Sequence, residues 1–290
     1  MNVTKKEKST SINCWRSKLI CFSTEYAITY SSGIDMVAYF CPFVNPSGKN
    51  FARPDRFLLW AKQERDIIMS IKNCTRSGCK DVFHAFLVKN ARFDTELEIP
   101  CIKPENKIPL KLIPFSKSVG GTDHSCFVHF YEDDVSFERL WNNPQRYLPI
   151  LKKYKGVITP DFSLYRDMPL VMQQWNTYRN RAIGCWLQDN GIPTITNVRW
   201  GDERTFPFCC AGAPKNSIIA IGSHGCIKLL QERPYFINGL DYSVKTLQPK
   251  SIIIYGTAPD YIFDKYRKQG IEILQFDSTF MQTHRKSGDA

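Results

Sequence analysis

The sequence lacks the short motifs that identify common binding sites directly. It has no Gly-x-Gly-x-x-Gly fingerprint and no Gly-x4-Gly-Lys-Ser/Thr loop, so neither of the familiar nucleotide-binding signatures is present. Its eleven cysteines include no Cys-x-x-Cys pair and no repeating spacing, and no matched histidines accompany them. We therefore assign no metal site, no cofactor and no disulfide scaffold from the sequence.

Long apolar runs are also missing. No run approaches the 18 residues or so that a membrane-spanning helix needs. The first eleven residues are polar and contain lysines, unlike a secretory signal. Together with an odd number of cysteines, these absences predict an intracellular, cytoplasmic protein with reduced thiols and no membrane partner.

What the sequence does contain is ample material for a packed core. Of 290 residues, 43% are hydrophobic and 13% are aromatic, which excludes extensive disorder. The formal net charge is +11, spread along the chain rather than gathered in one segment. Such a charge weakly favours a polyanionic partner and locates no binding patch.

The first third of the chain is expected to be an α+β region, residues 14–110, behind a polar tail of residues 1–13. Aromatic and β-branched runs predict strands at 21–30, 34–43, 81–89 and 96–102, and a helix is predicted at 53–72. His84 lies in one of these apolar runs and is interpreted as a core residue. Residues 103–111, rich in lysine and proline, are the predicted linker.

Residues 111–280 alternate between strand and helix patterns and form the expected core domain, followed by a polar tail, 281–290. Strands are predicted at 126–131, 156–161, 192–200, 217–221, 251–255 and 271–276. Strands joined by helices are normally parallel. The fold class is therefore α/β, with a mostly parallel sheet that is either doubly wound or a partial or complete TIM-like barrel, preceded by the smaller α+β region.

The longest predicted helix runs from about Asp167, as the N-cap, to about Asn190, with Gly191 ending it. An apolar stripe is expected to face the core: Val171, Trp175, Tyr178, Ala182 and Trp186. The other faces carry the amides and arginines Gln173, Gln174, Asn176, Arg179, Asn180 and Arg181, of which Gln173, Asn176 and Asn180 lie on one face. We interpret that face as solvated, with a ligand-facing role as the alternative.

Polar residues cluster where the predicted strands end, which is where parallel sheets bind ligands. Asp161 and His224 are the candidate catalytic residues, as a carboxylate and a possible general acid or base. The candidate ligand-binding residues are Asn197, Arg199, Gly222, Ser223, Asp277 and Arg179. The turn 222–225 could present N–H groups to a phosphate, although such a turn is more often only a turn. Asp133 and Asp134 are interpreted either as ligands or as helix caps.

Several motifs of the core together resemble a known family. They are Ile158-Thr159-Pro160-Asp161-Phe162-Ser163, Met168-Pro169, Asn176-Thr177-Tyr178-Arg179-Asn180-Arg181, Asn190-Gly191-Ile192, Asn197-Val198-Arg199-Trp200-Gly201, Lys215-Asn216-Ser217 and Ile221-Gly222-Ser223-His224-Gly225. This set is similar to the bacterial and phage group called domain of unknown function 4417, over roughly residues 113–277. The resemblance implies a setting in a phage or mobile element and brings no catalytic role.

Two functional hypotheses follow. In the first, the strand ends form a pocket for a phosphorylated or nucleotide ligand. In the second, the protein binds nucleic acid as a non-catalytic accessory of its mobile element, through dispersed basic residues and the polar face of the long helix. A structural role in the virion ranks third, because it would leave the polar cluster at the strand ends without a purpose.

Overall fold

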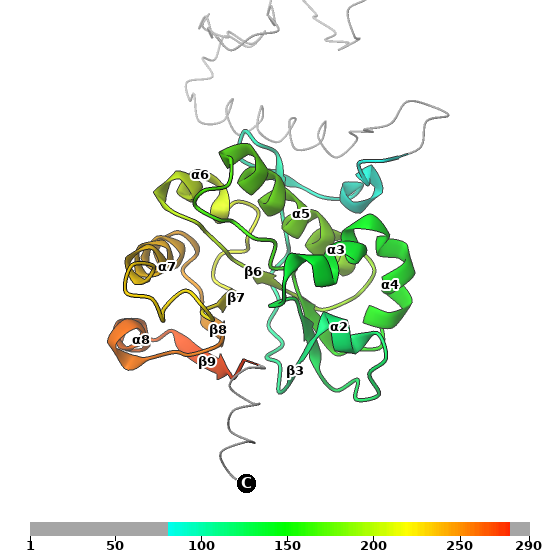
Figure 1. Cartoon of the computed structure of the whole chain (residues 1–290). Coiled ribbons are helices and arrows are strands. Elements are labelled where there is room, and N and C mark those ends of the chain that lie inside the picture. The colour runs from blue at the N-terminus through cyan, green and yellow to red at the C-terminus, as the bar shows by residue number, and fades with distance from the viewer. Residues whose placement is uncertain (1–80, 279–290) are drawn as a thin grey trace, which may run out of the picture. The chain divides into compact units, whose positions relative to one another are not determined.

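The computed structural model describes residues 81–278, and all structural statements below refer to them. The predicted strands at 21–30 and 34–43, the helix at 53–72 and both predicted tails lie outside this range. Seven parallel strands form one sheet in the described region, and a small antiparallel pair precedes it (Figure 1). The predicted α/β class with a smaller preceding region is confirmed.

The region before the sheet differs from its prediction in detail. Residues expected to form a strand at 81–89 instead contain a short 3-10 helix, Ala85–Val88, and His84 precedes it with φ of 55°. The antiparallel pair consists of β1 (Phe93–Asp94) and β2 (Ile99–Pro100). The His84 ring packs edge-on against Trp141, with centroids 5.1 Å apart.

The strands of the large sheet follow one another in space in the order in which they occur in the chain. They are β3 (Leu112–Pro114), β4 (Phe127–His129), β5 (Gly156–Ile158), β6 (Thr194–Asn197), β7 (Ile218–Gly222), β8 (Ser251–Tyr255) and β9 (Glu272–Phe276). All neighbouring pairs are parallel. A doubly wound sheet reverses its strand order at a switch point, whereas barrels keep chain order. Within residues 81–278 the architecture is thus a curled, barrel-like sheet of seven strands.

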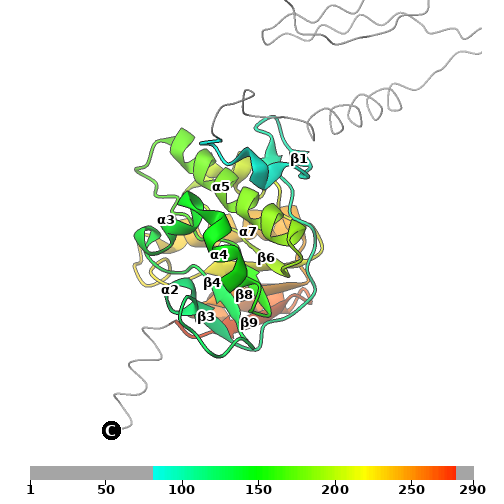
Figure 2. The same ribbon diagram turned by 90° about the vertical axis from the view of Figure 1, so that its right-hand side faces the viewer.

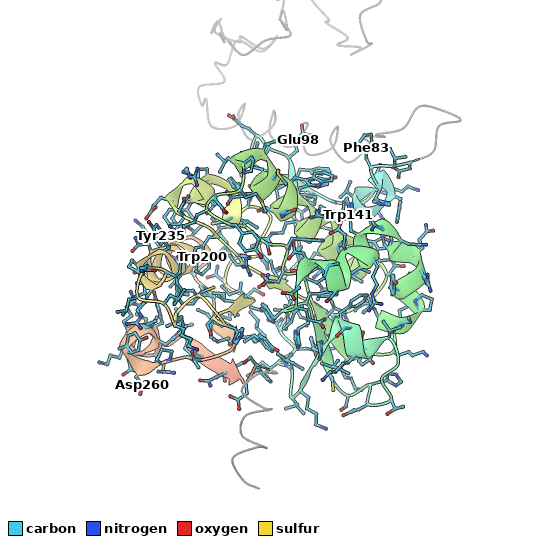
Figure 3. The ribbon with its side chains drawn as sticks, in the orientation of Figure 1. Phe83, Glu98, Trp141, Trp200, Tyr235 and Asp260 are labelled. Atoms are coloured by element: carbon cyan, nitrogen blue, oxygen red, sulfur yellow. The ribbon has the colours of Figure 1, made fainter. Side chains whose placement is uncertain are left out.

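Helices surround the sheet on its outer side (Figure 1). They are α2 (Phe115–Ser118), α3 (Asp134–Asn142), α4 (Pro144–Leu151), α5 (Leu170–Asp189), α6 (Phe206–Cys209), α7 (Arg233–Leu247) and α8 (Asp260–Arg267), with a 3-10 turn at Glu203–Thr205. Figure 3 shows Trp200 beside Tyr235 of α7, where the indole Nε1–H donates to the Tyr235 carbonyl at 3.1 Å. Such contacts fix the loop after β6 to the helix layer.

The curling of the sheet follows from which side chains meet. One apolar cluster takes residues from all seven strands: Leu112, Phe127, Ile158, Ile195, Ile218, Ala220, Ile253, Leu274 and Phe276. Their neighbours along the strands, such as Val128, Val157, Ile219 and Ile252, belong to other clusters, which pack under the helices. Leu112 on one edge strand and Leu274 on the other share the inner cluster, so the two edges approach each other. Figure 2 shows β3 and β9 close together, and they form no ladder in the described sheet.

Helix α5 turns its polar side chains inward, contrary to the prediction. Gln173, Asn176, Arg179, Asn180 and Arg181 are all buried, with at most 9% of any of them exposed. In the predicted core stripe, Ala182 and Trp186 are buried, but Val171 is 69% and Trp175 42% exposed. Asn180 and Arg181 donate to the backbone carbonyls of Pro160, just after β5, and of Asn197, at the end of β6. Arg181 also donates to the carbonyls of Cys209 and Ala211 at the end of α6, so these buried donors and acceptors are paired. The helix cap also differs, since Pro169 and not Asp167 is the N-cap, while Gly191 ends the helix at φ 78° as predicted.

The predicted linker, residues 103–111, contains no helix or strand but is bonded to the core. The Lys103 N–H donates to Gln188 Oε1 at 2.8 Å, and the Glu105 N–H donates to Ser217 Oγ at 3.2 Å. Strand β3 begins directly after this segment and was missed by the sequence analysis, because three residues are too few to show a pattern. The packed region therefore begins well before residue 111.

Candidate functional site

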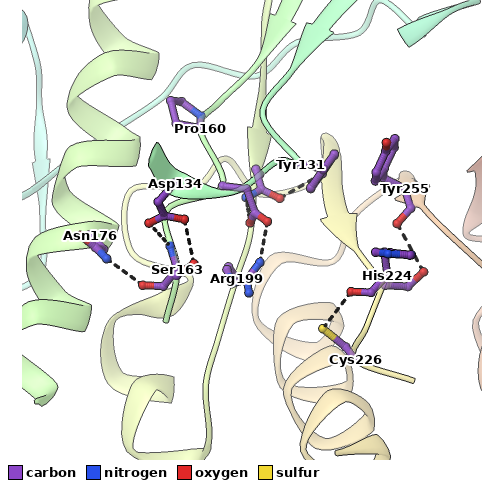
Figure 4. Close-up of polar contacts among 12 residues, drawn as sticks. Tyr131, Asp134, Pro160, Ser163, Asn176, Arg199, His224, Cys226 and Tyr255 are labelled. Atoms are coloured by element: carbon purple, nitrogen blue, oxygen red, sulfur yellow. Dashed lines mark hydrogen bonds and ion pairs between the residues drawn. The ribbon is translucent and has the colours of Figure 1, made fainter. Parts of the chain in front are cut away.

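The carboxyl ends of the strands bring together three of the predicted site residues. Asp161 follows β5, while Asn197 ends β6 and Arg199 lies two residues beyond it. Asn197 Nδ2 donates to Asp161 Oδ1 at 2.7 Å, and Arg199 Nη1 donates to Asp161 Oδ2 at 2.5 Å. Both carboxylate oxygens thus accept a hydrogen bond, and Figure 4 labels Arg199 with its contact drawn as a dashed line. An Asp161 held in this way is better suited to positioning Arg199 than to proton transfer.

Tyr131 extends this cluster to a third strand. Its hydroxyl donates to Asn197 Oδ1 at 3.0 Å, so a continuous chain of hydrogen bonds runs from Tyr131 through Asn197 and Asp161 to Arg199. Gly222 at the end of β7 makes room for the ring, because a methyl group there would lie 3.0 Å from Tyr131 Cδ1. We call Tyr131, Asn197, Asp161 and Arg199 the polar chain.

The two charges of the polar chain differ in their access to solvent. The Arg199 side chain is 28% exposed, against 9% for Asp161. Burial raises the pKa of Asp161 above its ordinary value, and Arg199 and the Asn197 amide oppose this shift. Burial also acts to lower the pKa of Arg199, but the adjacent Asp161 outweighs it and leaves that pKa raised. Within the described residues, Arg199 Nη2 and Nε have no hydrogen-bond partner and remain available to an incoming acceptor.

Helix α5 supports the polar chain from behind. Asn180 Oδ1 accepts from Thr159 Oγ1 at 3.1 Å, and the Thr159 hydroxyl in turn accepts from the Asn197 N–H at 2.8 Å. Arg181 reaches the Asn197 carbonyl at 2.9 Å. A void of about 10 Å³, room for about one water molecule, lies between these groups and Arg199. The polar face of α5 therefore sets the backbone positions of Asn197 and Thr159 and is closed to a larger ligand.

Arg179 lies apart from the polar chain, in the interface between α3 and α5. Its Nη1 contacts both Glu138 oxygens, at 2.7 and 2.9 Å, and its Nη2 donates to Asn176 Oδ1 at 2.6 Å. The guanidinium also covers the Phe162 ring at 3.9 Å. With these contacts Arg179 is engaged in helix packing, and no ligand contact is needed to explain its burial.

Asp134, one of the two aspartates weighed as ligands or caps, accepts from the Ser163 N–H at 3.1 Å and from its hydroxyl at 2.8 Å. It thereby holds the loop after β5 against the start of α3 (Figure 4). Asp133 is the N-cap residue of α3 and makes no side-chain capping hydrogen bond.

The turn after β7 uses much of its hydrogen-bonding capacity internally. The Ser223 N–H donates to the Tyr255 carbonyl at 3.0 Å, and its hydroxyl donates to the Thr257 carbonyl at 2.7 Å. The Cys226 N–H returns to the Ser223 carbonyl at 3.2 Å, and His224 is exposed on the turn between them. Because the Ser223 N–H is engaged inside the protein, we rank a phosphate cradle formed by the turn 222–225 below Arg199 as a candidate.

Three aromatic residues at the strand ends were missed by the sequence analysis. Tyr131 stacks on Tyr255 with centroids 4.7 Å apart and planes 11° from parallel, and the His129 ring lies 4.5 Å from that of Tyr255. Burial lowers the pKa of His129 to about 3, so its imidazole is neutral. Their positions in the sequence could have identified them, because His129 and Tyr131 are alternate residues at the end of one predicted strand and Tyr255 is the last residue of another.

A pocket of about 80 Å³ lies between the first and last strands of the sheet. Its apolar and aromatic wall comprises Leu112, Pro114, Tyr255 and Phe276, and its polar lining comprises Lys117, His129 and Asp277. We call it the seam pocket. It contains Asp277, the remaining predicted ligand residue, and Tyr131 connects it to the polar chain. Within residues 81–278 no group of three His, Cys, Asp or Glu side chains is arranged to hold a metal ion.

Comparison with known proteins gives one family. Its model, described as "Domain of unknown function (DUF4417)", matches residues 91–277. Curated relatives include the "Gene 1 protein" of Mycobacterium phage D29 and that of Mycobacterium phage L5, each 34% identical over 163 residues, or 55% of this chain. The matched region spans 60% of the D29 protein and 71% of the L5 protein. No solved structure matches the chain. No helix in the described part is both long and apolar enough to cross a membrane.

Proposed function

The chain belongs to the DUF4417 family, whose members include phage proteins, and on this premise we propose that it binds a phosphate-bearing small ligand, a nucleotide in particular, at the carboxyl ends of its strands. The observation that carries the proposal is Arg199, a half-buried guanidinium held at one end by Asp161 with its other nitrogens available. A guanidinium fixed in this way is a strong partner for a phosphate oxygen.

The position of Arg199 supports this function as well. Sheets of parallel strands in chain order form their sites at the carboxyl ends, from loops that vary while the scaffold stays rigid. Here Tyr131, Asp161 and Asn197 come from three neighbouring strands and are linked by hydrogen bonds. This arrangement orients Arg199 before a ligand arrives, which lowers the entropic cost of binding.

The alternative function is a non-catalytic accessory protein that binds nucleic acid, and the surface expected to bind it is not accessible. It required the arginine and amide face of α5 to be accessible, whereas Arg179, Asn180 and Arg181 are buried and bonded inside the protein. The net charge of +11 remains its support. A steep fall in affinity for DNA or RNA between about 50 and 200 mM salt would favour that alternative.

The test of the proposed function is calorimetric titration of the full chain with ribose 5-phosphate and with nucleoside monophosphates. The informative variant is Asp161→Asn/Arg199→Gln, which removes both charges and leaves no buried carboxylate unpaired. We expect at least a roughly 10-fold loss of affinity for ribose 5-phosphate, the size of a lost charge-assisted hydrogen bond.

The matched control is Asp202→Asn/Arg204→Gln, the same two changes in an ion pair whose arginine side chain is 55% exposed. It should bind as the wild type does. Equal affinity of wild type and the Asp161/Arg199 variant for ribose 5-phosphate, or no binding by either, would refute the proposed function.

A further inference from the structure

The seam pocket has the size and lining of a site for a flat ring. Its volume of about 80 Å³ corresponds to roughly five to eight water-sized groups, which is commensurate with a single six-membered heterocycle. Tyr255 and Phe276 contribute aromatic walls, and Leu112 and Pro114 contribute aliphatic ones. The surface that the pocket exposes is more polar than apolar, and small-molecule sites use such polar groups to fix the orientation of a ligand between apolar walls.

The polar groups of the pocket bring no excess of one charge. Lys117 and Asp277 are of opposite formal sign, and the third polar group, His129, is neutral. A ligand group carrying a full charge therefore gains less here than beside Arg199. An uncharged but polar ring fits this lining best.

His129 offers the pocket one hydrogen-bond donor, its Nε2–H group. The side chain is only 2% exposed, and its Nδ1 accepts the Tyr131 N–H at 3.2 Å. A neutral imidazole with an accepting Nδ1 carries its proton on Nε2. Among the described residues Nε2–H has no hydrogen-bond partner, and the residue lines the pocket. An oxygen acceptor inside the pocket would satisfy this donor.

Tyr131 places the seam pocket next to the polar chain. Its backbone N–H bonds to His129, its ring stacks on Tyr255, and its hydroxyl bonds to Asn197. Tyr131 thus contacts two residues that line the pocket, His129 and Tyr255, and is itself a member of the polar chain. A ligand that combines a flat ring with an anionic group could therefore place its ring in the seam pocket and its anionic group beside Arg199.

We propose that the seam pocket binds the base of a pyrimidine nucleotide, with His129 Nε2–H donating to a ring carbonyl and Tyr255 and Phe276 contacting the ring. The inference deepens the proposed function, since it presumes that Arg199 holds the phosphate of the same ligand. Stacking on aromatic side chains supplies part of the affinity, and the hydrogen bond from His129 sets the orientation of the base.

The experiment compares three probes by calorimetric titration of the full chain: uridine, ribose 5-phosphate and uridine monophosphate. His129→Phe keeps a ring and removes the donor, and it should lower the affinity for uridine and its monophosphate roughly 3- to 10-fold. Its affinity for ribose 5-phosphate should not change. His124→Phe, the same replacement in the loop before β4, is the control and should bind all three probes normally.

The outcomes separate the two proposals. If the protein binds ribose 5-phosphate but not uridine, the base site is refuted and the phosphate site is supported. If it binds uridine but not ribose 5-phosphate, the phosphate site is refuted and the base site is supported. A second readout needs no variant: uridine should shift the imidazole ¹⁵N resonance of His129 Nε2 in the wild-type protein. An unshifted resonance at saturating uridine would show that the base lies elsewhere.

Discussion

Arg181 of α5 donates a hydrogen bond from Nη1 to the backbone carbonyl of Asn197, 2.9 Å away at the end of β6. Its other nitrogens reach the carbonyls of Ala211 and Cys209, each at 2.9 Å. The side chain is 1% exposed, and within the described region no carboxylate pairs with it. Burial accordingly lowers its pKa to about 10, and the guanidinium is held by backbone dipoles instead of a counter-charge.

Replacing Arg181 by Met should be strongly destabilising. The carbonyls of Cys209 and Ala211 would lose their side-chain donor in a buried place, and that of Asn197 would keep only the 3.5 Å contact with Asn180 Nδ2. Each unsatisfied group costs about 1–3 kcal/mol. We expect the free energy of unfolding, measured by urea denaturation, to fall by about 3 kcal/mol or more. Arg204→Met, at an exposed arginine, is the control and should change it by less than about 1 kcal/mol. A small loss for Arg181→Met would mean that water replaces the guanidinium.

Asp161 and Arg199 should be coupled in stability. Arg199→Gln leaves a buried carboxylate without its charge partner, so we expect a loss of roughly 2 kcal/mol, moderated because Arg199 is partly exposed. The double variant with Asp161→Asn should lose less than the sum of the two single variants, by at least about 1 kcal/mol. Chemical denaturation of all four proteins gives this coupling. If the losses of the two single variants add up to that of the double variant, the interaction between Asp161 and Arg199 contributes nothing to stability.

His129 should make the protein less stable in mild acid. Its pKa is about 3 in the folded protein and ordinarily 6.5, so between these values the unfolded chain binds a proton that the folded chain does not. The free energy of unfolding therefore falls as the pH drops below 6.5, by roughly 2 kcal/mol at pH 5. His129→Phe should lack this component when thermal or urea unfolding is followed from pH 7 to pH 5, and His124→Phe should retain it. Identical pH profiles for wild type and His129→Phe would contradict the burial of a neutral imidazole.

Gly212 should tolerate no side chain. Its φ is 67°, and a methyl group there would contact the backbone carbonyl oxygen of Pro100 in β2. Gly212→Ala should therefore lower the free energy of unfolding by about 2 kcal/mol or more, because both the backbone conformation and the packing of β2 oppose it. At Gly120 a methyl would meet nothing within 4 Å, and Gly120→Ala should be nearly neutral in the same denaturation experiment. If the two variants are equally stable, β2 does not pack against the segment around Gly212 that follows α6.

Much of the fold could be predicted from periodicity and turn residues. Runs such as Ser251–Tyr255, with three consecutive isoleucines and Gly256 directly after it, indicated strands buried on both faces. All six strands predicted in the core are present. Glycine at 191 indicated the end of α5. The same local reasoning placed Asp161, Asn197 and Arg199 at the carboxyl edge of a parallel sheet, because strands joined by helices run in one direction.

What the sequence determined by itself was therefore the class of the fold and the edge of the sheet on which polar residues gather. The tertiary structure alone decided that Tyr131 joins Asn197, that His129 and Asp277 border one pocket, and that α5 turns Asn180 and Arg181 inward. The physical reason is that hydrophobic periodicity records where apolar surface is available. It does not record which backbone carbonyls need a side-chain donor, and Asn180 and Arg181 of α5 supply such donors after β5, at the end of β6 and at the end of α6.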